Sequence, residues 1–341
     1  MDPEPFRGFS PHCPNCRTQG RDVALNVTEW QELDGQGILV CPAEGCRKRF
    51  PVIDGVPVLV ADLPRFLHEA GVYLLARVDL SAPVADLLGS ILPPGSWFDA
   101  TRQHLSGYVR DHWGAFDATD RSAPAPGQAW ALAQAGLALA GAVLGPVVEL
   151  GAAAGGVTRS LAEAFDTPVL GLDLSAPLAR FAARALRGGT LRYPLRLAGT
   201  AYEDRVISVP PPLRGNCNIW IADATVPPLG SGCAGLVLAL NLLDCVSDPA
   251  GLLRAAAALL RPGGHLLLCT PLDWSTAATP VEAWVGARAA DAAAPDLGSW
   301  AEATSGLSVV ARNSEHGWDV RVHARATMHY RAELLVLRRP G

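Results

Sequence analysis

The second half of the chain alternates between short apolar runs and segments with helical periodicity. The apolar runs predict β-strands near 146–151, 168–173, 218–222, 234–240, 264–270, 307–312 and 325–338. The segments between them predict helices near 156–166, 176–187, 249–260 and 281–290. Such alternation is typical of a mostly parallel sheet with helices on both faces, so we expect an α/β domain.

A turn of small residues follows the first strand of this region. Val148-Glu149-Leu150 leads into Gly151-Ala152-Ala153-Ala154-Gly155-Gly156, where a helix is expected to begin. Small side chains let the backbone approach a ligand closely. The next strand ends in Asp173, and a carboxylate at that point can bind the two hydroxyls of a ribose. Together these features predict a site for a nucleoside-containing cofactor.

The turn lacks the signatures of two common nucleotide sites. The dinucleotide fingerprint requires a glycine at the position of Ala153, and no P-loop lysine follows the turn. Its form, E-x-G-x-x-x-G from Glu149 to Gly155, resembles motif I of the class I S-adenosylmethionine (SAM) dependent methyltransferases.

Three later segments strengthen this resemblance. Ile219–Ala224 is similar to the strand and acidic residue that meet the adenine, 236–241 to the fourth strand, and 261–265 to the turn after the fourth helix. The resemblance implies a Rossmann-like, seven-stranded sheet with an antiparallel strand in 324–338, and SAM as cofactor. The residues that it assigns to cofactor binding are Glu149, Gly151, Ala153, Gly155, Asp173, Asp223, Ala224 and Asn241.

Four cysteines near the start of the chain form two close pairs. Cys13 and Cys16 form C-x2-C, Cys41 and Cys46 form C-x4-C, and twenty-four residues separate the pairs. This spacing is typical of a zinc ribbon, where four thiolates make a closed tetrahedral site with a structural role. Disulfides are the alternative, which a cytosolic setting disfavours. Buried free thiols are expected at the other cysteines, Cys217, Cys233, Cys245 and Cys269.

The sequence after the second cysteine pair, Arg49–Val60, resembles the zinc-ribbon activator subunits of tRNA, rRNA and protein methyltransferases. The resemblance implies an activator-like ribbon fused in cis over residues 8–62, which would cover an apolar edge of the catalytic domain. Residues 63–127 are expected to form a helical connector that contains the aromatic and polar cluster Tyr108–Gly114. This cluster either covers the cofactor as a lid or simply packs on the sheet. Residues 128–341 are then the methyltransferase domain.

A second resemblance concerns the acceptor. Residues 146–338 are similar to the methyltransferase domain of ovothiol-biosynthesis enzymes, which methylates an imidazole nitrogen of a thiolated histidine. The segments that carry this similarity are 191–193, 239–244, 247–249, 270–274, 282–286 and the pair Arg325 and His329. The chain differs at Cys245, where that domain usually has arginine. The resemblance implies N-methylation of a small-molecule or peptide acceptor, with a histidine-like imidazole favoured.

Three residues are candidates for the catalytic roles. Asp244 and Trp274 follow the fourth and fifth strands, at the sheet edge where ligands bind in such folds. Asp244 can orient an imidazole N–H, Trp274 can stack on the ring or surround the sulfonium, and His329 can act as a base or orienting group. Their structural alternatives are a helix cap, a core aromatic residue and a strand histidine with a satisfied partner.

Composition narrows the possible partners. The net charge of −5 argues against strong attraction to nucleic acid, although an rRNA or tRNA methyltransferase remains an alternative, as does a non-catalytic SAM-binding scaffold. The acidic start at 1–5 is unlike a secretory signal, which predicts a cytoplasmic protein. The apolar stretch 129–150 is expected to be a buried helix that leads into the first strand, because Gln134 and Gly145-Pro146 interrupt it.

Overall fold

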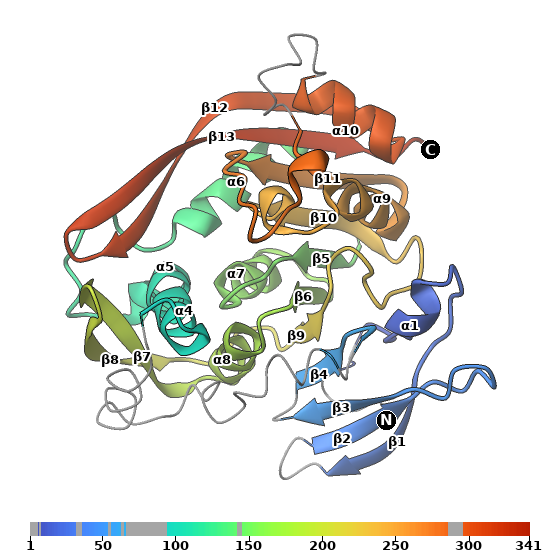
Figure 1. Cartoon of the computed structure of the whole chain (residues 1–341), viewed down its shortest axis with the longest axis horizontal. Helices are drawn as coiled ribbons and strands as arrows, with labels where there is room; N and C mark the ends of the chain where they lie inside the picture. The colour runs from blue at the N-terminus through green and yellow to red at the C-terminus, as the bar shows by residue number, and fades with distance from the viewer. Residues whose placement is uncertain are drawn as a thin grey trace.

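The computed structural model describes residues 6, 8–31, 36–53, 56–62, 65, 94–141, 145–285 and 296–341. Its main feature is one sheet of eleven strands in the order β1-β2-β3-β4-β9-β6-β5-β10-β11-β13-β12 (Figure 1). A separate hairpin pairs β7 (Gly189–Ala198) with β8 (Ala201–Val209). Helices and strands carry the labels of Figure 1.

Seven strands of the large sheet form the predicted α/β core. β9, β6, β5, β10 and β11 run parallel, and β13 and then β12 complete the sheet in antiparallel pairings. The carboxyl ends of the parallel strands therefore share one edge, and this arrangement confirms the predicted fold class. The strand bounds are β5 Val147–Leu150, β6 Val169–Asp173, β9 Cys217–Ala222, β10 Ala234–Leu240, β11 Leu260–Thr270, β12 Ser308–His323 and β13 Ala326–Arg338.

Helices cover both faces of this core. On one face, α6 (Gln128–Ala140) and α7 (Gly156–Ala164) pack around β5, while α8 (Ala176–Arg187) packs on β9. On the other face lie α9 (Pro249–Leu259) and α10 (Leu297–Ser305). Within the apolar stretch at 129–150, the described residues form α6 and β5, a helix that leads into the first strand as predicted. Within the described ranges, no helix is long and apolar enough to cross a membrane.

Among the elements that differ from the sequence prediction are two segments between β11 and β12. The described part of 281–290 has one 3-10 turn, Val281–Ala283, instead of a helix, and residues 286–290 lie outside the described residues. The indole N–H of Trp274 donates to the carbonyl of Val285 at 3.2 Å, which fixes the chain in this non-helical path. The second difference is the helix α10, which the sequence analysis did not predict; Asp296 caps its first turn by accepting from Gly298 and Ser299.

The N-terminal strands extend the sheet. β1 (Asn26–Gln31), β2 (Gln36–Val40), β3 (Arg49–Ile53) and β4 (Val56–Leu59) form an antiparallel series. β4 then pairs in parallel with β9, so Val58 lies beside Ile221. The ring of Phe6 packs edge-on against Trp220, with 5.9 Å between centroids. The cysteine-containing segment and the α/β core therefore share one apolar cluster.

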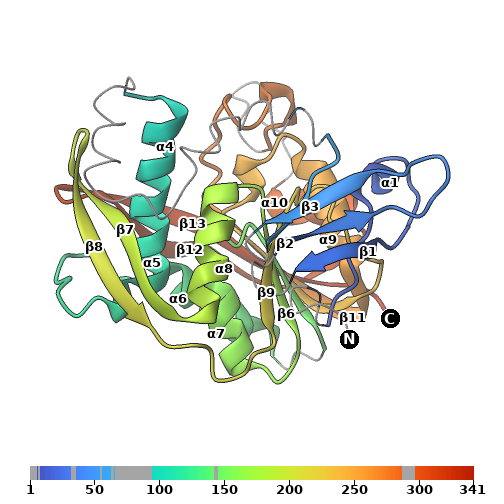
Figure 2. The same cartoon turned by 90° about the horizontal axis from the view of Figure 1, so that it is seen from below.

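A long helical segment and the β7–β8 hairpin lie at the end of the molecule opposite the N-terminal strands (Figure 2). The helical segment runs through α4 (Trp97–His104), a π-helical turn η2 (Leu105–Val109), α5 (Arg110–Trp113) and a 3-10 turn η3 (Gly114–Phe116). The hairpin occupies most of residues 190–216, a segment rich in proline and arginine between α8 and β9. The guanidinium of Arg205 joins the two parts through an ion pair with Asp117 at 2.8 Å.

Candidate functional site

The turn after β5 adopts a conformation that depends on its small residues. Gly151 and Gly155 have φ angles of +75° and +79°, and that of Ala153 is +46°. A Cβ atom on Gly155 would lie 2.7 Å from the Cβ of Ala182 in α8. The turn therefore packs closely on the next helix, which requires small residues at this point.

Two carboxylates flank this turn. Asp173 accepts hydrogen bonds from the backbone N–H groups of Ala153 and Ser175, both at 2.7 Å. Glu149 is 3% exposed and accepts a hydrogen bond from the hydroxyl of Thr158 at 2.5 Å. Burial raises the pKa of Asp173, and burial with the nearby Asp173 charge raises the pKa of Glu149 to about 8. Ligand hydroxyls that donate to Asp173 would stabilise its charged form.

The remaining predicted cofactor residues follow β9 and β10. Asp223, beside Ala224, accepts hydrogen bonds from the N–H and the hydroxyl of Thr225 at 2.8 and 2.7 Å. Asn241 has a φ of +50°, and its amide oxygen is buried without a hydrogen-bond partner among the described residues. A buried acceptor without a partner destabilises the fold. It fits a ligand that brings a positively charged N–H donor, such as the amino group of SAM.

The α4–α5 segment is bonded directly to the glycine-rich turn. The indole N–H of Trp113 donates to the carbonyl of Ala154 at 2.7 Å, and the N–H of Gly156 donates to Nδ1 of His112 at 2.9 Å. Burial lowers the pKa of His112, which suits a neutral ring that accepts at Nδ1. Tyr108 lies one turn earlier, within the π-helical turn, and its ring meets that of His112 edge-on at 6.4 Å.

Asp244 lies just beyond the end of β10, in a short 3-10 turn. Its side chain is 3% exposed and accepts a hydrogen bond from the N–H of Asp273 at 2.7 Å. Burial is the main cause that raises the pKa of Asp244. The carboxylate of Asp273 accepts in turn from the hydroxyl of Tyr330, at 2.9 Å. These contacts join the ends of β10 and β11 to β13.

The other two candidate catalytic residues have different surroundings. Trp274 is partly buried, next to Asp273, and stacks on Trp284 with 6.2 Å between ring centroids. The His329 ring is 64% exposed and pairs through Nδ1 with Asp319 at 2.6 Å, across the β12–β13 pair. Trp274 thus follows Asp273, whose N–H binds Asp244. His329 is instead paired with a different carboxylate, that of Asp319.

Sequence reasoning missed two phenols that the structure brings to this edge. Tyr330 follows His329, and because side chains alternate along a strand it points to the opposite face, where it stacks on Trp318 at 5.3 Å. Tyr108 comes from a distant helix. Although 40% of its surface is accessible, its surroundings raise its pKa, through burial first and then the charges of Cys245, Asp173, Tyr330 and Asp244. Alternation along β13 places His329 and Tyr330 on opposite faces without selecting between them, and no local signal indicated Tyr108.

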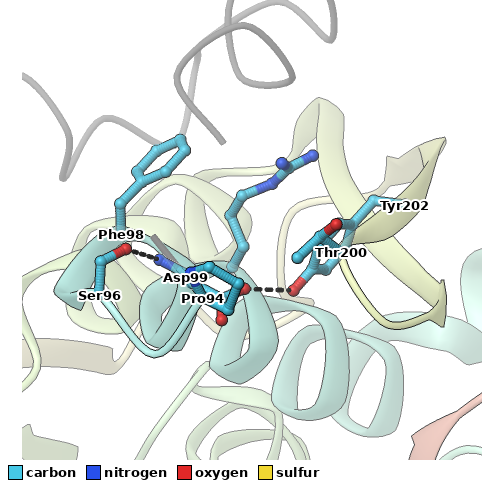
Figure 3. Close-up of a pocket in the computed structure, with 7 residues that line it drawn as sticks. Pro94, Ser96, Phe98, Asp99, Thr200 and Tyr202 are labelled. Atoms are coloured by element: carbon cyan, nitrogen blue, oxygen red, sulfur yellow. Dashed lines mark hydrogen bonds between the residues drawn. The ribbon is translucent and has the colours of Figure 1, made fainter. Parts of the chain in front are cut away.

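A small pocket lies elsewhere, between the start of α4 and the β7–β8 turn (Figure 3). The guanidinium of Arg102 lies 4.1 Å from the ring centre of Tyr202 there, and the Tyr202 hydroxyl donates to Asp99 at 3.4 Å. None of the predicted site residues lines this pocket. Its contacts hold the hairpin against the helix.

The four N-terminal cysteines converge. All four sulfur atoms lie within 4.8 Å of one another, and the Cys13–Cys46 and Cys16–Cys41 sulfur distances are both 3.7 Å. Sulfurs at the corners of a tetrahedron are about 3.8 Å apart when each lies about 2.3 Å from a central zinc ion. The side-chain amide of Asn15 also donates to Cys46, at 3.3 Å. The donor set and its spacing therefore fit a tetrahedral zinc ion.

Comparisons with known proteins agree with this fold. Residues 127–314, more than half of the chain, match the family described as "Methyltransferase domain". No curated protein sequence matches the chain. Two solved structures illustrate the similarity. A Haloferax volcanii complex of the Trm112 methyltransferase activator and a putative methyltransferase has 16% identity over 68% of this chain and 97% of that chain, with a TM-score of 0.42. Geranyl diphosphate C-methyltransferase from Streptomyces coelicolor has 14% identity over 62% and 76%, with a TM-score of 0.41.

The family match covers the strands β5, β6, β9, β10 and β11, together with the glycine-rich turn between β5 and α7. The sheet order and the carboxylate at the end of β6 agree with it. The chain belongs to this methyltransferase-domain family and is a class I SAM-dependent methyltransferase.

Proposed function

We propose that this enzyme transfers the methyl group of SAM to a nitrogen of a small-molecule or peptide acceptor, with a histidine-like imidazole favoured. The observation that carries the proposal is the buried Asp244 carboxylate, next to the carboxyl end of β10 and hydrogen-bonded to the backbone of Asp273. A carboxylate accepts an N–H hydrogen bond well, so Asp244 can orient an imidazole ring by its N–H group.

The cofactor would be held by the residues around the turn after β5. Asp173 would accept hydrogen bonds from the ribose hydroxyls, and Asp223 from the adenine. The amide oxygen of Asn241 would accept one from the amino group of SAM. The bound sulfonium supplies an electrophilic methyl group. Gly151, Ala153 and Gly155 would bring the backbone close to SAM. Glu149 would stabilise the turn by accepting the hydrogen bond of the Thr158 hydroxyl in α7.

The reaction needs alignment more than a strong base. A neutral imidazole nitrogen already carries a lone pair, so the protein must hold that nitrogen in line with the methyl group and exclude water. Asp244 would orient the ring, and Trp274 would stack on it or line the sulfonium. We place His329 in a lesser role, because Asp319 already binds its Nδ1 atom.

The charges around the acceptor edge favour this class over RNA. The charges that most strongly raise the pKa of Tyr108 come from Cys245, Asp173, Tyr330 and Asp244, after burial. Those that raise the pKa of Tyr330 to about 12, after burial, come from Asp273, Asp244 and Cys245. Cys245 and Tyr330 are neutral at pH 7, because the pKa of each is raised to about 12, so the aspartates among these groups supply the negative charge. A negative field attracts the sulfonium and a protonated acceptor, and it repels phosphate groups.

We also propose that residues 8–62 form a ribbon that binds one structural zinc ion through Cys13, Cys16, Cys41 and Cys46. A site with four thiolates has no open position for water, so it would stabilise the fold without taking part in methyl transfer. Its position supports a stabilising role, because β4 pairs with β9 and Asp223 follows β9. Residues 94–127, the continuous described part of the predicted connector 63–127, would then cover the cofactor through the contacts of His112 and Trp113; residues 63–64 and 66–93 lie outside the described residues.

The test supplies labelled SAM to the full-length enzyme with histidine derivatives, histidine-containing peptides and RNA in parallel reactions. We expect label in an imidazole compound and none in RNA. Label in RNA alone would reject the proposed acceptor and support an rRNA or tRNA methyltransferase. Label in an amine or peptide without an imidazole would retain N-methylation but reject the favoured ring.

A further inference from the structure

The helix α7 begins without a cap from its own flanking residue. That residue is Gly155, which has no side chain to accept from the free backbone N–H groups of the first turn. The turn nevertheless requires glycine here, since its φ is +79° and a Cβ would lie 2.7 Å from that of Ala182. The conformation of the turn therefore leaves the start of α7 to be capped from another part of the chain.

The imidazole of His112 in α5 supplies this cap. The N–H of Gly156, the first residue of α7, donates to Nδ1 of His112 at 2.9 Å. The two segments approach so closely that a Cβ on Gly156 would lie 2.6 Å from the Cβ of His112. On the other side of Gly155, the carbonyl of Ala154 accepts from the indole N–H of Trp113 at 2.7 Å. Two neighbouring residues of α5 thus bind the turn.

The cap exists only while the His112 ring is neutral. A backbone N–H can only donate, so Nδ1 must carry a lone pair and the ring proton must lie on Nε2. A protonated ring donates from both nitrogens, so it would present an N–H to the N–H of Gly156. It would also place a positive charge at the positive end of the α7 dipole. Proton binding at His112 and the cap on α7 therefore exclude each other.

The charged groups around α5 have partners of their own. The Asp111 carboxylate, next to His112, accepts from three backbone N–H groups at the start of α6, at 2.8 to 3.0 Å. The other titratable groups on α5 and on the described elements packed against it are Arg110, Tyr108, Arg159 and Glu163. Arg110 pairs with Asp120 at 2.6 Å, and Arg159 pairs with Glu163 at 2.9 Å. A protonated His112 would therefore compete for carboxylates that are already bound.

The same turn holds the carboxylate that we assign to the ribose. The N–H of Ala153 donates to Asp173 at 2.7 Å, three residues before Gly156. We propose that His112 is a positioning residue for the cofactor: its neutral ring caps α7 and holds the turn, and its protonation releases the turn and weakens cofactor binding. This inference rests on the proposed cofactor site and adds a regulation of that site by pH.

A single proton separates the two states of the turn. Burial lowers the pKa of His112 below its ordinary value of 6.5, and the charge of Asp111 acts in the opposite direction. The cap is therefore complete at neutral pH and is lost as the pH falls through this lowered pKa. Cofactor affinity should fall over the same range by at most about tenfold per pH unit, since one proton is linked to binding. Protonation of Asp173 in acid acts in the same direction, so variants of His112 must separate the two groups.

Calorimetric titration of the full-length protein with S-adenosylhomocysteine, from about pH 5.5 to about pH 8, tests the proposal. His112→Asn places an amide oxygen near the position of Nδ1, an acceptor that does not titrate. We expect it to bind within about twofold of the wild type at neutral pH and to lose less affinity in acid. His112→Phe has no acceptor and should bind about tenfold more weakly at neutral pH. The matched control is His104→Asn, whose exposed ring contacts Tyr108 instead of the turn, and it should behave as the wild type.

Hydrogen exchange of the Gly156 amide in the cofactor-free protein gives a second readout. At neutral pH its protection should be similar in the wild type and His112→Asn, and lower in His112→Phe. An acid loss of affinity as large in His112→Asn as in the wild type would overturn the proposal, and so would wild-type affinity in His112→Phe. A wild-type protein that binds no S-adenosylhomocysteine at any pH would instead reject the proposed cofactor site. The exchange of Gly156 would then still decide whether His112 caps α7, and equal protection in all variants would exclude the cap.

Discussion

The two halves of the proposed site at the sheet edge, a cofactor side and an acceptor side, are built in different ways. On the cofactor side, each polar residue follows its own strand directly, as Asp173 follows β6 and Asp223 follows β9. On the acceptor side, Asp244, Asp273, Tyr330 and Tyr108 come from four separate segments. A local strand–turn–helix pattern can therefore predict the first side, whereas the second side exists only once distant segments have packed.

The largest expected effect comes from removing the N-terminal zinc site, which should disturb the cofactor side. Cys41→Ser should abolish zinc binding and unfold the ribbon, because the binding free energy of a structural zinc ion is largely folding free energy. SAM affinity should also fall, since β4 pairs with β9 next to Asp223. Metal analysis and calorimetry check both expectations.

The matched control is Cys245→Ser outside the cluster; this cysteine is exposed, so the prediction of a buried thiol there was wrong. The variant should keep one zinc ion per chain. Wild-type protein without tightly bound metal, or a disulfide among the four N-terminal cysteines, would contradict the zinc assignment. Loss of zinc with unchanged SAM affinity would separate the ribbon from the cofactor side.

Glu149 should make the stability of the cofactor side depend on pH. Its folded pKa is raised to about 8, so the folded state holds this proton more tightly than the unfolded state does. The resulting stability is complete below the ordinary pKa of about 4.3 and is lost as the pH rises towards about 8, by at most ~1.4 kcal/mol per pH unit. Urea unfolding of the SAM-free protein across this range measures the loss.

Glu149→Gln should flatten that dependence, because glutamine does not titrate. The control Glu163→Gln, on a partly exposed side chain paired with Arg159, should retain it. A steep loss of stability that persists in Glu149→Gln would show that another group carries the effect.

Tyr330 and His329 sharpen the comparison on the acceptor side. We expect Tyr330→Phe to lower kcat about tenfold, because loss of a hydrogen bond to a charged group costs about 1.5 kcal/mol and here releases Asp273 beside Asp244. His329→Gln should have a smaller effect, since that ring is exposed and bonded to Asp319. Steady-state kinetics of both variants test the order, and the reverse order would restore His329 to the catalytic role.

The same contrast explains how far the sequence predicts the structure. β5, β6, α7 and α8 lie within a few residues of their predicted bounds, because apolar periodicity and small turn residues determine them locally. The apolar pattern predicted the sixth strand only over 307–312, whereas β12 continues to His323. Its second half is polar, and its pairing with β13 and the contact of Ala324 with Arg196 stabilise it instead. These contacts join distant segments and leave no local pattern.

The site residues follow the same rule. The residues proposed for cofactor binding follow the strands β5, β6, β9 and β10, and the four cysteine sulfurs converge as their spacing predicted. Among the acceptor candidates, Asp244 and Trp274 lie near the sheet edge, while His329 points to the face opposite Tyr330. A shift of one residue along a strand changes the face, so pattern alone could not select between these neighbours.

The most direct test of this division measures S-adenosylhomocysteine affinity and turnover for Asp173→Ala and Asp244→Ala together. For Asp173→Ala, we predict a loss of affinity of about 1.5–3 kcal/mol, because charge-assisted hydrogen bonds to the ribose disappear. For Asp244→Ala, we predict wild-type affinity and a fall in kcat of about a hundredfold, because a misplaced acceptor no longer aligns with the methyl group. Equal loss of cofactor affinity in both variants would contradict the division of the site into two halves.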